Sequence, residues 1–298
     1  MEKRHVDQQV VDLYDSFTHG LIDRRTFMER LTAIAGSFAA ATAMLPLLQN
    51  DYARAAIVPA NDTRLVIEKA SYDAGGTPMS GYLARLKGDS LGDAKRPAVI
   101  LIHENRGLNP HTEDVTRRLA LDGFLAFGID ALSPLGGTPP DEDKAREMIG
   151  SLNAGETAQR IAAAIPFLAK HAGSTGNVGA VGFCWGGGMV NRIAALSPDL
   201  KAGVAYYGAQ GAAADVPKIS APLMLHYAGL DQRINAGIPA YEEALKAAGK
   251  RYTVHMYPDV NHAFNNDTGN RYDKAAADLA WSRTIAFFTE HLGAPPKA

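Results

Sequence analysis

The stretch Val178-Gly179-Ala180-Val181-Gly182-Phe183-Cys184-Trp185-Gly186-Gly187-Gly188 decides the fold. Its first half holds only apolar residues and glycine, as in a strand that is buried on both faces of a sheet. Its second half opens a predicted helix, so that Cys184 lies on the turn between the two elements. Glycine at positions 182 and 186 removes Cβ atoms that would collide in such a turn, and Gly187 and Gly188 permit close packing of the helix on the sheet. The stretch therefore predicts a strand–turn–helix unit that presents a cysteine at the edge of a sheet.

Short apolar runs recur along the chain and alternate with segments of helical spacing. The predicted strands are Arg64–Lys69, Gly81–Leu86, Ala98–Ile102, Phe124–Ile129, Val178–Phe183, Ala202–Tyr207, Pro222–Tyr227 and Tyr252–Tyr257. The predicted helices are Thr112–Leu121, Gly155–His171, Met189–Leu196, Ile238–Ala248 and Tyr272–Leu292. The first two strands flank Ala74-Gly75-Gly76 and are predicted to form an antiparallel hairpin. The alternation predicts one α/β domain over residues 61–298, with an eight-stranded, mostly parallel sheet and helices on both faces, which is the α/β-hydrolase fold.

The composition is that of a soluble globular protein. Of the 298 residues, 46% are hydrophobic and 21% are charged, and the formal net charge is −2. Lysine and arginine are scattered rather than clustered, so we expect no nucleic-acid partner. The single cysteine excludes an internal disulfide. Composition leaves the oligomeric state open.

Residues 1–60 differ from the rest and form a predicted N-terminal extension. Asp23-Arg24-Arg25-Thr26-Phe27-Met28 precedes the uncharged stretch Leu31–Asn50, and Ala53-Arg54-Ala55 follows with the A-x-A form of a cleavage site. This order resembles a twin-arginine export signal and predicts an exported or periplasmic protein, although Asp23 stands where serine or threonine is usual. The alternative is a retained extension of a cytoplasmic protein, with an amphipathic helix over Asp7–Phe17 and a second, apolar helix packed on the domain. The apolar run is short and alanine-rich, so we expect no stable membrane span.

Two further residues stand where an α/β-hydrolase places the partners of its nucleophile. Asp231 follows the seventh predicted strand, and His262 follows the eighth. The order nucleophile, acid, histidine is that of the fold. We expect Cys184 to be the nucleophile, His262 to take its proton, and Asp231 to hold the imidazole in one tautomer. Taken singly, each has a structural alternative: a buried core cysteine, a turn-forming aspartate and a loop histidine.

Glu104 is a fourth candidate catalytic residue. It follows the third predicted strand in His103-Glu104-Asn105-Arg106-Gly107, the loop that supplies an oxyanion donor in this fold. A carboxylate near a thiol could hold or accept its proton, or it could pair with Arg106 and order the loop. The other histidines that we considered have structural interpretations; they are His103, His111, His226, His255 and His291. No histidine pair shows metal-ligand spacing with cysteine or a carboxylate, so we predict no metal and no cofactor.

These motifs, in this order, resemble the dienelactone hydrolase (carboxymethylenebutenolidase) family from about Thr63 to the C-terminus. The matching segments are Gly182-Phe183-Cys184-Trp185-Gly186-Gly187, Tyr206-Tyr207-Gly208, Gly229-Leu230-Asp231 and Asn261-His262-Ala263-Phe264, together with Glu104. In the family, the glutamate interacts with the resting cysteine and helps to activate it when substrate binds. The resemblance assigns this role to Glu104 and the oxyanion hole to the backbone N–H groups of Trp185 and Asn105.

Two departures from the family bear on the substrate. Members that open dienelactones hold the substrate carboxylate with two arginines, and the matching positions here are Pro134 and Asn266. Arg106 or Arg271 could replace them, and we name Arg106 and Tyr207 as candidate substrate-binding residues. Neither proline nor asparagine reproduces a bidentate arginine clamp. We therefore expect a different small-molecule ester, lactone or thioester.

Other functions stay open from sequence. The chain could be a thioesterase or another acyl hydrolase, because the predicted cap segment Thr138–Asn153 sets specificity. It could also be a non-catalytic protein in which Cys184 senses oxidants or electrophiles. The complete order of Asp231 and His262 after Cys184 favours the enzyme.

Overall fold

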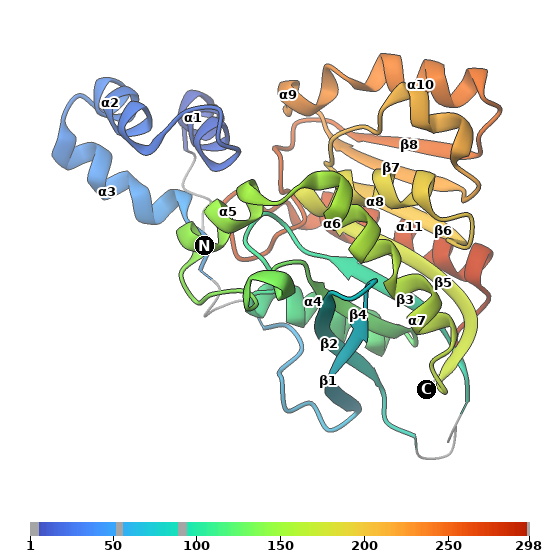
Figure 1. Ribbon diagram of the computed structural model, residues 1–298. Helices are drawn as coiled ribbons and strands as arrows, with labels where there is room; N and C mark the ends of the chain where they lie inside the picture. The colour runs from blue at the N-terminus through green and yellow to red at the C-terminus, as the bar shows by residue number, and fades with distance from the viewer. Residues whose placement is uncertain (1–5, 52–55, 89–93, 297–298) are drawn as a thin grey trace.

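The computed structural model describes residues 6–51, 56–88 and 94–296. Its centre is one eight-stranded sheet in the order β1-β2-β4-β3-β5-β6-β7-β8 (Figure 1). The strands are β1 (Leu65–Asp73), β2 (Pro78–Leu86), β3 (Arg96–Ile102), β4 (Leu125–Asp130), β5 (Ser174–Phe183), β6 (Ala202–Tyr206), β7 (Leu223–Ala228) and β8 (Tyr252–Tyr257). Strands β1 and β2 pair antiparallel, β2 pairs antiparallel with β4, and the remaining pairs are parallel. The predicted hairpin and α/β-hydrolase sheet are confirmed.

Helices cover both faces of this sheet and extend beyond it. They are α1 (Gln8–Thr18), α2 (Arg24–Ala35), α3 (Phe38–Leu48), α4 (Pro110–Leu121), α5 (Glu142–Ser151), α6 (Ala154–Ala162), α7 (Ala164–Ala169), α8 (Trp185–Leu196), α9 (Gln232–Asn235), α10 (Ile238–Ala247) and α11 (Lys274–Leu292). The prediction of one helix over Gly155–His171 is wrong, because α6 and α7 break at Ala163. Pro166 has no N–H to donate to the carbonyl four residues earlier, so the helical ladder is interrupted there. Helix α5 lies in the predicted cap segment and was not foreseen as a helix.

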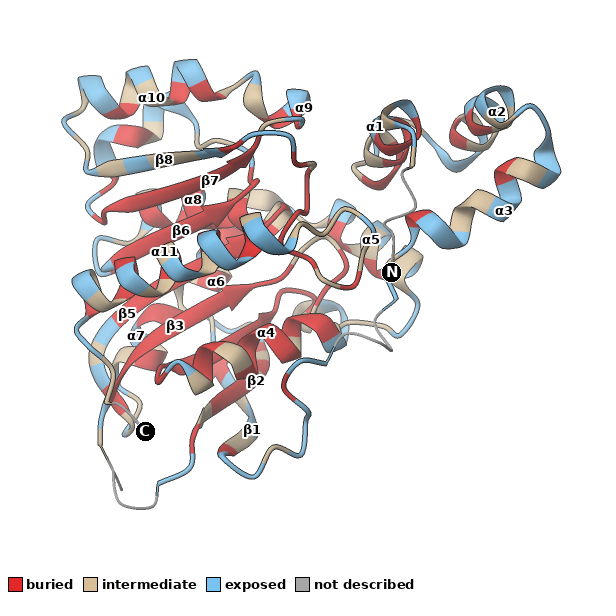
Figure 2. Cartoon of the chain, turned by 180° about the vertical axis from the view of Figure 1, so that it is seen from behind, coloured by how far each residue is buried: buried red, intermediate tan, exposed pale blue. Residues whose placement is uncertain are grey.

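The inner strands are buried on both faces. Every residue of β3, β4, β6 and β7 is buried, as the red strands in Figure 2 show. One face packs against α4 and α11 through Leu119 and Phe288, and the other against α6, α8 and α10 through Ile161, Ile193 and Leu245. Two-sided burial explains why these strands are apolar at almost every position instead of alternating, with Arg96, Asp130 and His226 as the exceptions.

The N-terminal extension folds into three helices with a small core of their own. Helix α1 lies next to the α/β domain, and α2 and α3 lie farther out (Figures 1 and 2). The core packs Val10, Phe17, Phe27 and Leu31 together, and Phe17 stacks on Phe27 with ring centroids 4.7 Å apart. Asp23 caps α2 by accepting a hydrogen bond from the backbone N–H of Thr26, which gives this aspartate a structural role.

The predicted apolar helix of the extension is two helices rather than one. Gly36 adopts a left-handed conformation that ends α2, and Ser37 caps α3. No single helix among the described residues is long and apolar enough to cross a membrane; α2 and α3 pass that test only as a pair bent by 109°. The predicted cleavage sequence Ala53-Arg54-Ala55 lies outside the described residues, and export stays a prediction.

Candidate active site

The cysteine sits on a strained turn at the carboxyl end of β5. Cys184 has φ 54° and ψ −116°, and its N–H donates to the carbonyl of Tyr206 at 3.0 Å. A Cβ on Gly182 would lie 2.1 Å from the carbonyl oxygen of Gly186, and a Cβ on Gly186 would lie 2.3 Å from that of Ile102. Backbone atoms cannot yield to such contacts, so both glycines are required. The predicted strand–turn–helix geometry is confirmed.

The two following glycines differ from each other. A Cβ on Gly187 would lie 2.7 Å from the carbonyl oxygen of Tyr206, as close packing predicts. The same prediction is wrong for Gly188, where the nearest atom, on Ala209, would be 3.6 Å away. That distance is an ordinary van der Waals contact, so this position does not require glycine.

Gly186→Ala is expected to destabilise the protein by about 3 kcal/mol or more and to abolish any activity of the site, because the turn must shift to admit the methyl group. Denaturant unfolding and ester turnover measure the two effects. Gly188→Ala is the matched control. It adds the same methyl group two residues later, where the nearest atom would be 3.6 Å away and no atom has to move, and alanine is favoured over glycine inside a helix by about 1 kcal/mol. Equal losses in the two variants would contradict the requirement for glycine at 186.

Asp231 and His262 meet beside the cysteine, although they follow different strands. Asp231 follows β7 and caps α9 by accepting the N–H of Ile234, and His262 follows β8. Nδ1 of His262 donates to a carboxylate oxygen of Asp231 at 2.6 Å. A carboxylate only accepts, so Nε2 of the neutral ring is left with a free lone pair. That Nε2 is buried without a hydrogen-bond partner. A ring nitrogen of His262 lies within 4.8 Å of the Cys184 sulfur.

The electrostatics of the pair favour a thiolate. Burial alone would raise the pKa of the Cys184 thiol, but the neighbouring imidazoles of His262 and His19 lower it to about 6. Burial alone would lower the pKa of His262, but the Cys184 thiolate, Asp15 and Asp231 raise it to about 10. Between these two values the charged form, thiolate beside imidazolium, is favoured. Such a thiolate is the nucleophilic form of cysteine.

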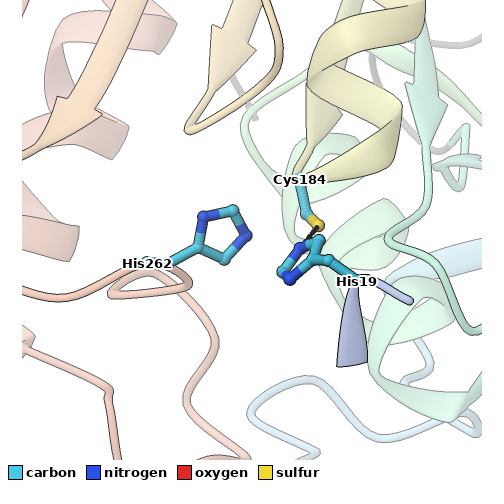
Figure 3. A group of neighbouring side chains, drawn as sticks. All are labelled: His19, Cys184 and His262. Carbon is cyan, nitrogen blue, oxygen red and sulfur yellow. Dashed lines mark hydrogen bonds between the residues drawn. The ribbon is translucent and has the colours of Figure 1, made fainter. Parts of the chain in front are cut away.

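Sequence reasoning missed His19, which makes a side-chain hydrogen bond to the cysteine. It caps the C-terminus of α1, and its Nε2 lies 3.2 Å from Sγ of Cys184. Figure 3 shows the rings of His19 and His262 next to each other near the sulfur, with the hydrogen bond drawn to His19. The rings meet edge to face with centroids 4.8 Å apart. No local pattern marks His19, because it belongs to the extension and lies 165 residues before Cys184.

Glu104 lies at the site with partners other than the cysteine. Its carboxylate accepts from the hydroxyl of Tyr207 at 3.3 Å and from Nδ2 of Asn266 at 2.8 Å. Asn266, at one of the two positions where the resemblance implies an arginine, here orients the glutamate. No hydrogen bond joins Glu104 to Cys184 within the described part of the chain. The catalytic role that the resemblance gives Glu104 stays a prediction.

The remaining predicted residues surround the same space. Trp185, Asn105 and Tyr207 line the pocket that holds Cys184. Arg106 contributes to a smaller space behind the cysteine and forms an ion pair with Glu142 at 3.1 Å. Arg271 forms an ion pair with Asp15 at 2.9 Å. The two arginines that could replace the lost clamp are thus each engaged with a carboxylate of the protein itself. The oxyanion and substrate-binding assignments stay predictions.

The pocket has a volume of about 530 Å³, which suits a small organic molecule. Helix α5 contributes Arg146, Glu147 and Ile149 to its wall, as the predicted cap segment implies. The turn after α1 contributes Thr18 through Leu21. The walls therefore come from the α/β domain and from the N-terminal extension together.

A metal ion is chemically possible at this point. The ligand atoms of His19, Cys184 and His262 all lie within 4.8 Å of one another, as do those of Asp15, Asp231 and His262. One sulfur and two imidazole nitrogens are ligands that Zn²⁺ accepts. Spacing in the sequence could not reveal this group, because its members come from three distant segments. The prediction of no metal stays a prediction.

Comparison with known proteins agrees with the fold and the motifs. The family model described as "Dienelactone hydrolase family" matches residues 79–292, and one described as "YqhI-like" matches residues 1–36. Proteins named "Putative carboxymethylenebutenolidase" from Escherichia coli K12 and Saccharolobus solfataricus are 32% and 28% identical to the chain. The alignment with the first covers 80% of this chain and 92% of that relative. The alignment with the second covers 72% of this chain and 95% of that relative.

A solved structure gives the same result. The crystal structure of a "Putative Dienelactone Hydrolase" from Klebsiella pneumoniae is 26% identical, with a TM-score of 0.68. The match covers 76% of this chain and 99% of that one. A family match over more than half of the chain, with agreement of sequence relatives and fold, establishes the relationship. The chain therefore belongs to the dienelactone hydrolase family, whose enzymes hydrolyse lactone or ester bonds.

Proposed function

We propose that this enzyme hydrolyses a small ester or lactone through a Cys184–His262–Asp231 triad and a thioester intermediate. The observation that carries the proposal is the meeting of three residues that are distant in the sequence, of which Cys184 and His262 line one pocket and Asp231 binds His262. Cys184 stands on the strained turn, and Asp231 holds His262 at 2.6 Å with its free Nε2 turned toward the sulfur. This is the geometry of nucleophile, base and orienting acid.

The chemistry follows from these groups. The Cys184 thiolate attacks the carbonyl carbon, and a carbon–sulfur bond forms while the carbonyl electrons move onto oxygen. The backbone N–H groups of Trp185 and Asn105 are proposed to bind that oxyanion. The intermediate collapses, the carbon–oxygen bond to the alcohol breaks, and the leaving alkoxide takes a proton from an imidazolium at the site. His262 then removes a proton from water, which attacks the thioester and releases the acid and the thiolate.

The substrate is proposed to be an ester, lactone or thioester other than a dienelactone. Neither Pro134 nor Asn266, at the positions of the family's two arginines, is among the residues that line the pocket. Arg106 and Arg271, the candidate replacements, form ion pairs with Glu142 and Asp15. A substrate carboxylate would have to compete with these internal partners, which favours a substrate without one.

The test of this proposal is capture of the acyl-enzyme. With p-nitrophenyl acetate, we expect rapid release of one equivalent of p-nitrophenol and one acetyl group on the protein, in a hydroxylamine-sensitive bond. Because the chain has one cysteine, mass spectrometry of peptides assigns a thioester to Cys184 without ambiguity. A panel of lactones, aryl esters and acyl thioesters then ranks the substrate classes. Absence of both acylation and turnover across the panel would contradict the proposal and favour a sensing role for the thiol.

A further inference from the structure

Helix α1 is held onto the active site by the segments that carry the catalytic residues. Nδ2 of Asn105, next to Glu104, donates to the carbonyl of Thr18 at 2.8 Å. Asn261, next to His262, bonds with Gln8 at 2.7 Å. Nη1 of Arg146 in the cap donates to the carbonyl of Phe17 at 3.1 Å.

Asp15 adds charged contacts on the same side of α1. Its carboxylate pairs with Arg233, two residues after Asp231, at 3.3 Å, and with Arg271 at 2.9 Å. The loops after β3, β7 and β8 and the cap thus all contact one helix of the extension. A helix joined to each of these segments is part of the wall of the site.

The ring of His19 is oriented by its own helix. Nδ1 lies 2.8 Å from the backbone carbonyl oxygen of Asp15 and 3.4 Å from the carboxylate of the same residue. Oxygen atoms of these kinds only accept, so Nδ1 carries a hydrogen, and Nε2 of the neutral ring presents its lone pair to the sulfur at 3.2 Å. A thiol in this position donates its hydrogen to Nε2.

We propose that His19 is a second catalytic histidine, which takes the thiol proton of Cys184 in the acylation step. This inference rests on the proposed role of Cys184 as the nucleophile. It gives the resting cysteine a partner in the extension in place of Glu104, whose carboxylate is bound by Tyr207 and Asn266.

The two steps of the reaction use different imidazoles: His19 transfers the proton in acylation, and His262 transfers the proton in deacylation. The S–H bond breaks, and its proton moves to Nε2 of His19, which leaves a thiolate beside an imidazolium. The imidazolium is stabilised by the carboxylate of Asp15. After the thiolate has attacked, the imidazolium returns this proton to the leaving alkoxide and becomes neutral. Formation of the thioester removes the thiolate charge beside His262, and this ring, whose Nε2 has no hydrogen-bond partner, deprotonates the water of the second step. The proton then passes from His262 to the departing thiolate, which restores the resting thiol.

The charges around the sulfur support this assignment. The titratable and charged groups that face this pair of side chains are Asp15 from α1, Asp231 and Arg233 after β7, His262 and Arg271 after β8, Glu104 after β3, Tyr207 after β6, and Arg146 and Glu147 from α5. Burial would raise the pKa of Asp15, but His262, His19, Arg271 and Arg233 hold it well below its ordinary value, so this carboxylate stays charged.

The experiment measures alkylation of the single cysteine by iodoacetamide as a function of pH, in the full chain. Thiolate reacts and thiol does not, so the wild-type rate is expected to rise with pH through a midpoint of about 6. In His19→Ala the midpoint is expected to rise by about one unit or more, since one of the two imidazoles is lost. Alkylation at pH 6 then falls about fivefold, and the single-turnover acylation rate with p-nitrophenyl acetate falls by about 10²-fold. Added imidazole is expected to restore part of both rates.

The control is Gln8→Ala, which loosens the other end of α1 without touching the sulfur, and it is expected to keep the wild-type midpoint.

In His262→Ala, deacylation is expected to slow more than acylation, so that the acetyl-enzyme accumulates. An unchanged midpoint and acylation rate in His19→Ala would overturn the inference. A faster alkylation or acylation rate in His19→Ala would also overturn the inference, because it would show that His19 and the end of α1 block access to the sulfur. If Cys184→Ala still turned over esters, the proposed function itself would fail, whatever His19→Ala did.

Discussion

Cys184→Ala is expected to lower kcat/KM for p-nitrophenyl acetate by about 10⁴-fold or more, because the attacking atom is removed and no neighbouring group replaces it. The side chain is buried, and the other residues of the pocket stay in place, so substrate binding should change far less than turnover. The measurement is steady-state kinetics together with mass spectrometry, in which the acetyl adduct should disappear.

Two comparisons make this result specific. Thermal unfolding of Cys184→Ala should resemble that of the wild type, because a small side chain is replaced by another small one. Cys184→Ser should keep some turnover, because the turn and the imidazoles are still present. Near-normal hydrolysis by the alanine variant would show that another residue attacks the carbonyl.

Asp231→Asn is expected to reduce kcat by roughly 10³- to 10⁴-fold while KM changes little. The carboxylate accepts a hydrogen bond from Nδ1 of His262 at 2.6 Å, and an amide can turn its NH₂ toward that nitrogen and stabilise the wrong tautomer. The charge that helps to raise the pKa of His262 is also lost. Kinetics of the variant across pH 5 to 10 measures both effects.

The substitution Asp231→Asn removes the charge of the side chain and is expected to leave the local fold unchanged. Asparagine can still cap α9, because its side-chain oxygen can accept the N–H of Ile234 as the aspartate does at 3.2 Å. Asp215→Asn, at an exposed ion pair with Lys218, is the matched control and should leave kcat unchanged. A small loss in Asp231→Asn would indicate that Asp15, which lies near the same imidazole, supplies the missing charge.

Much of the fold could be predicted from the chain alone. Strands such as β3 and β7 are apolar at all positions but Arg96 and His226, since both of their faces are covered, and this makes them easy to locate. The break between α6 and α7 was missed, because a single proline late in a helical pattern can end, kink or merely open a helix. Helix α5 was missed because its ten residues carry only two buried side chains, Ala145 and Ile149.

The candidate site was predictable where it depends on the order of elements. A residue at the carboxyl end of a parallel strand is bound to lie at one edge of the sheet, so Cys184, Asp231 and His262 could be brought together from their positions after β5, β7 and β8. The partners of Glu104 could not be foreseen, because the hydroxyl of Tyr207 and the amide of Asn266 reach it across loops whose shape the sequence does not encode locally.

By itself, the sequence determined the α/β sheet, the strained turn and the positions of the three residues of the proposed triad, because each depends on short-range sterics or on strand order. Only the tertiary structure decided that the cysteine's direct hydrogen-bond partner is His19, at 3.2 Å from a segment 165 residues earlier. The sequence of an amphipathic helix shows that one of its faces is buried, but it does not show which surface covers that face. The surface that α1 covers is assembled from loops after three different strands and from the cap, so it exists only once the domain has folded.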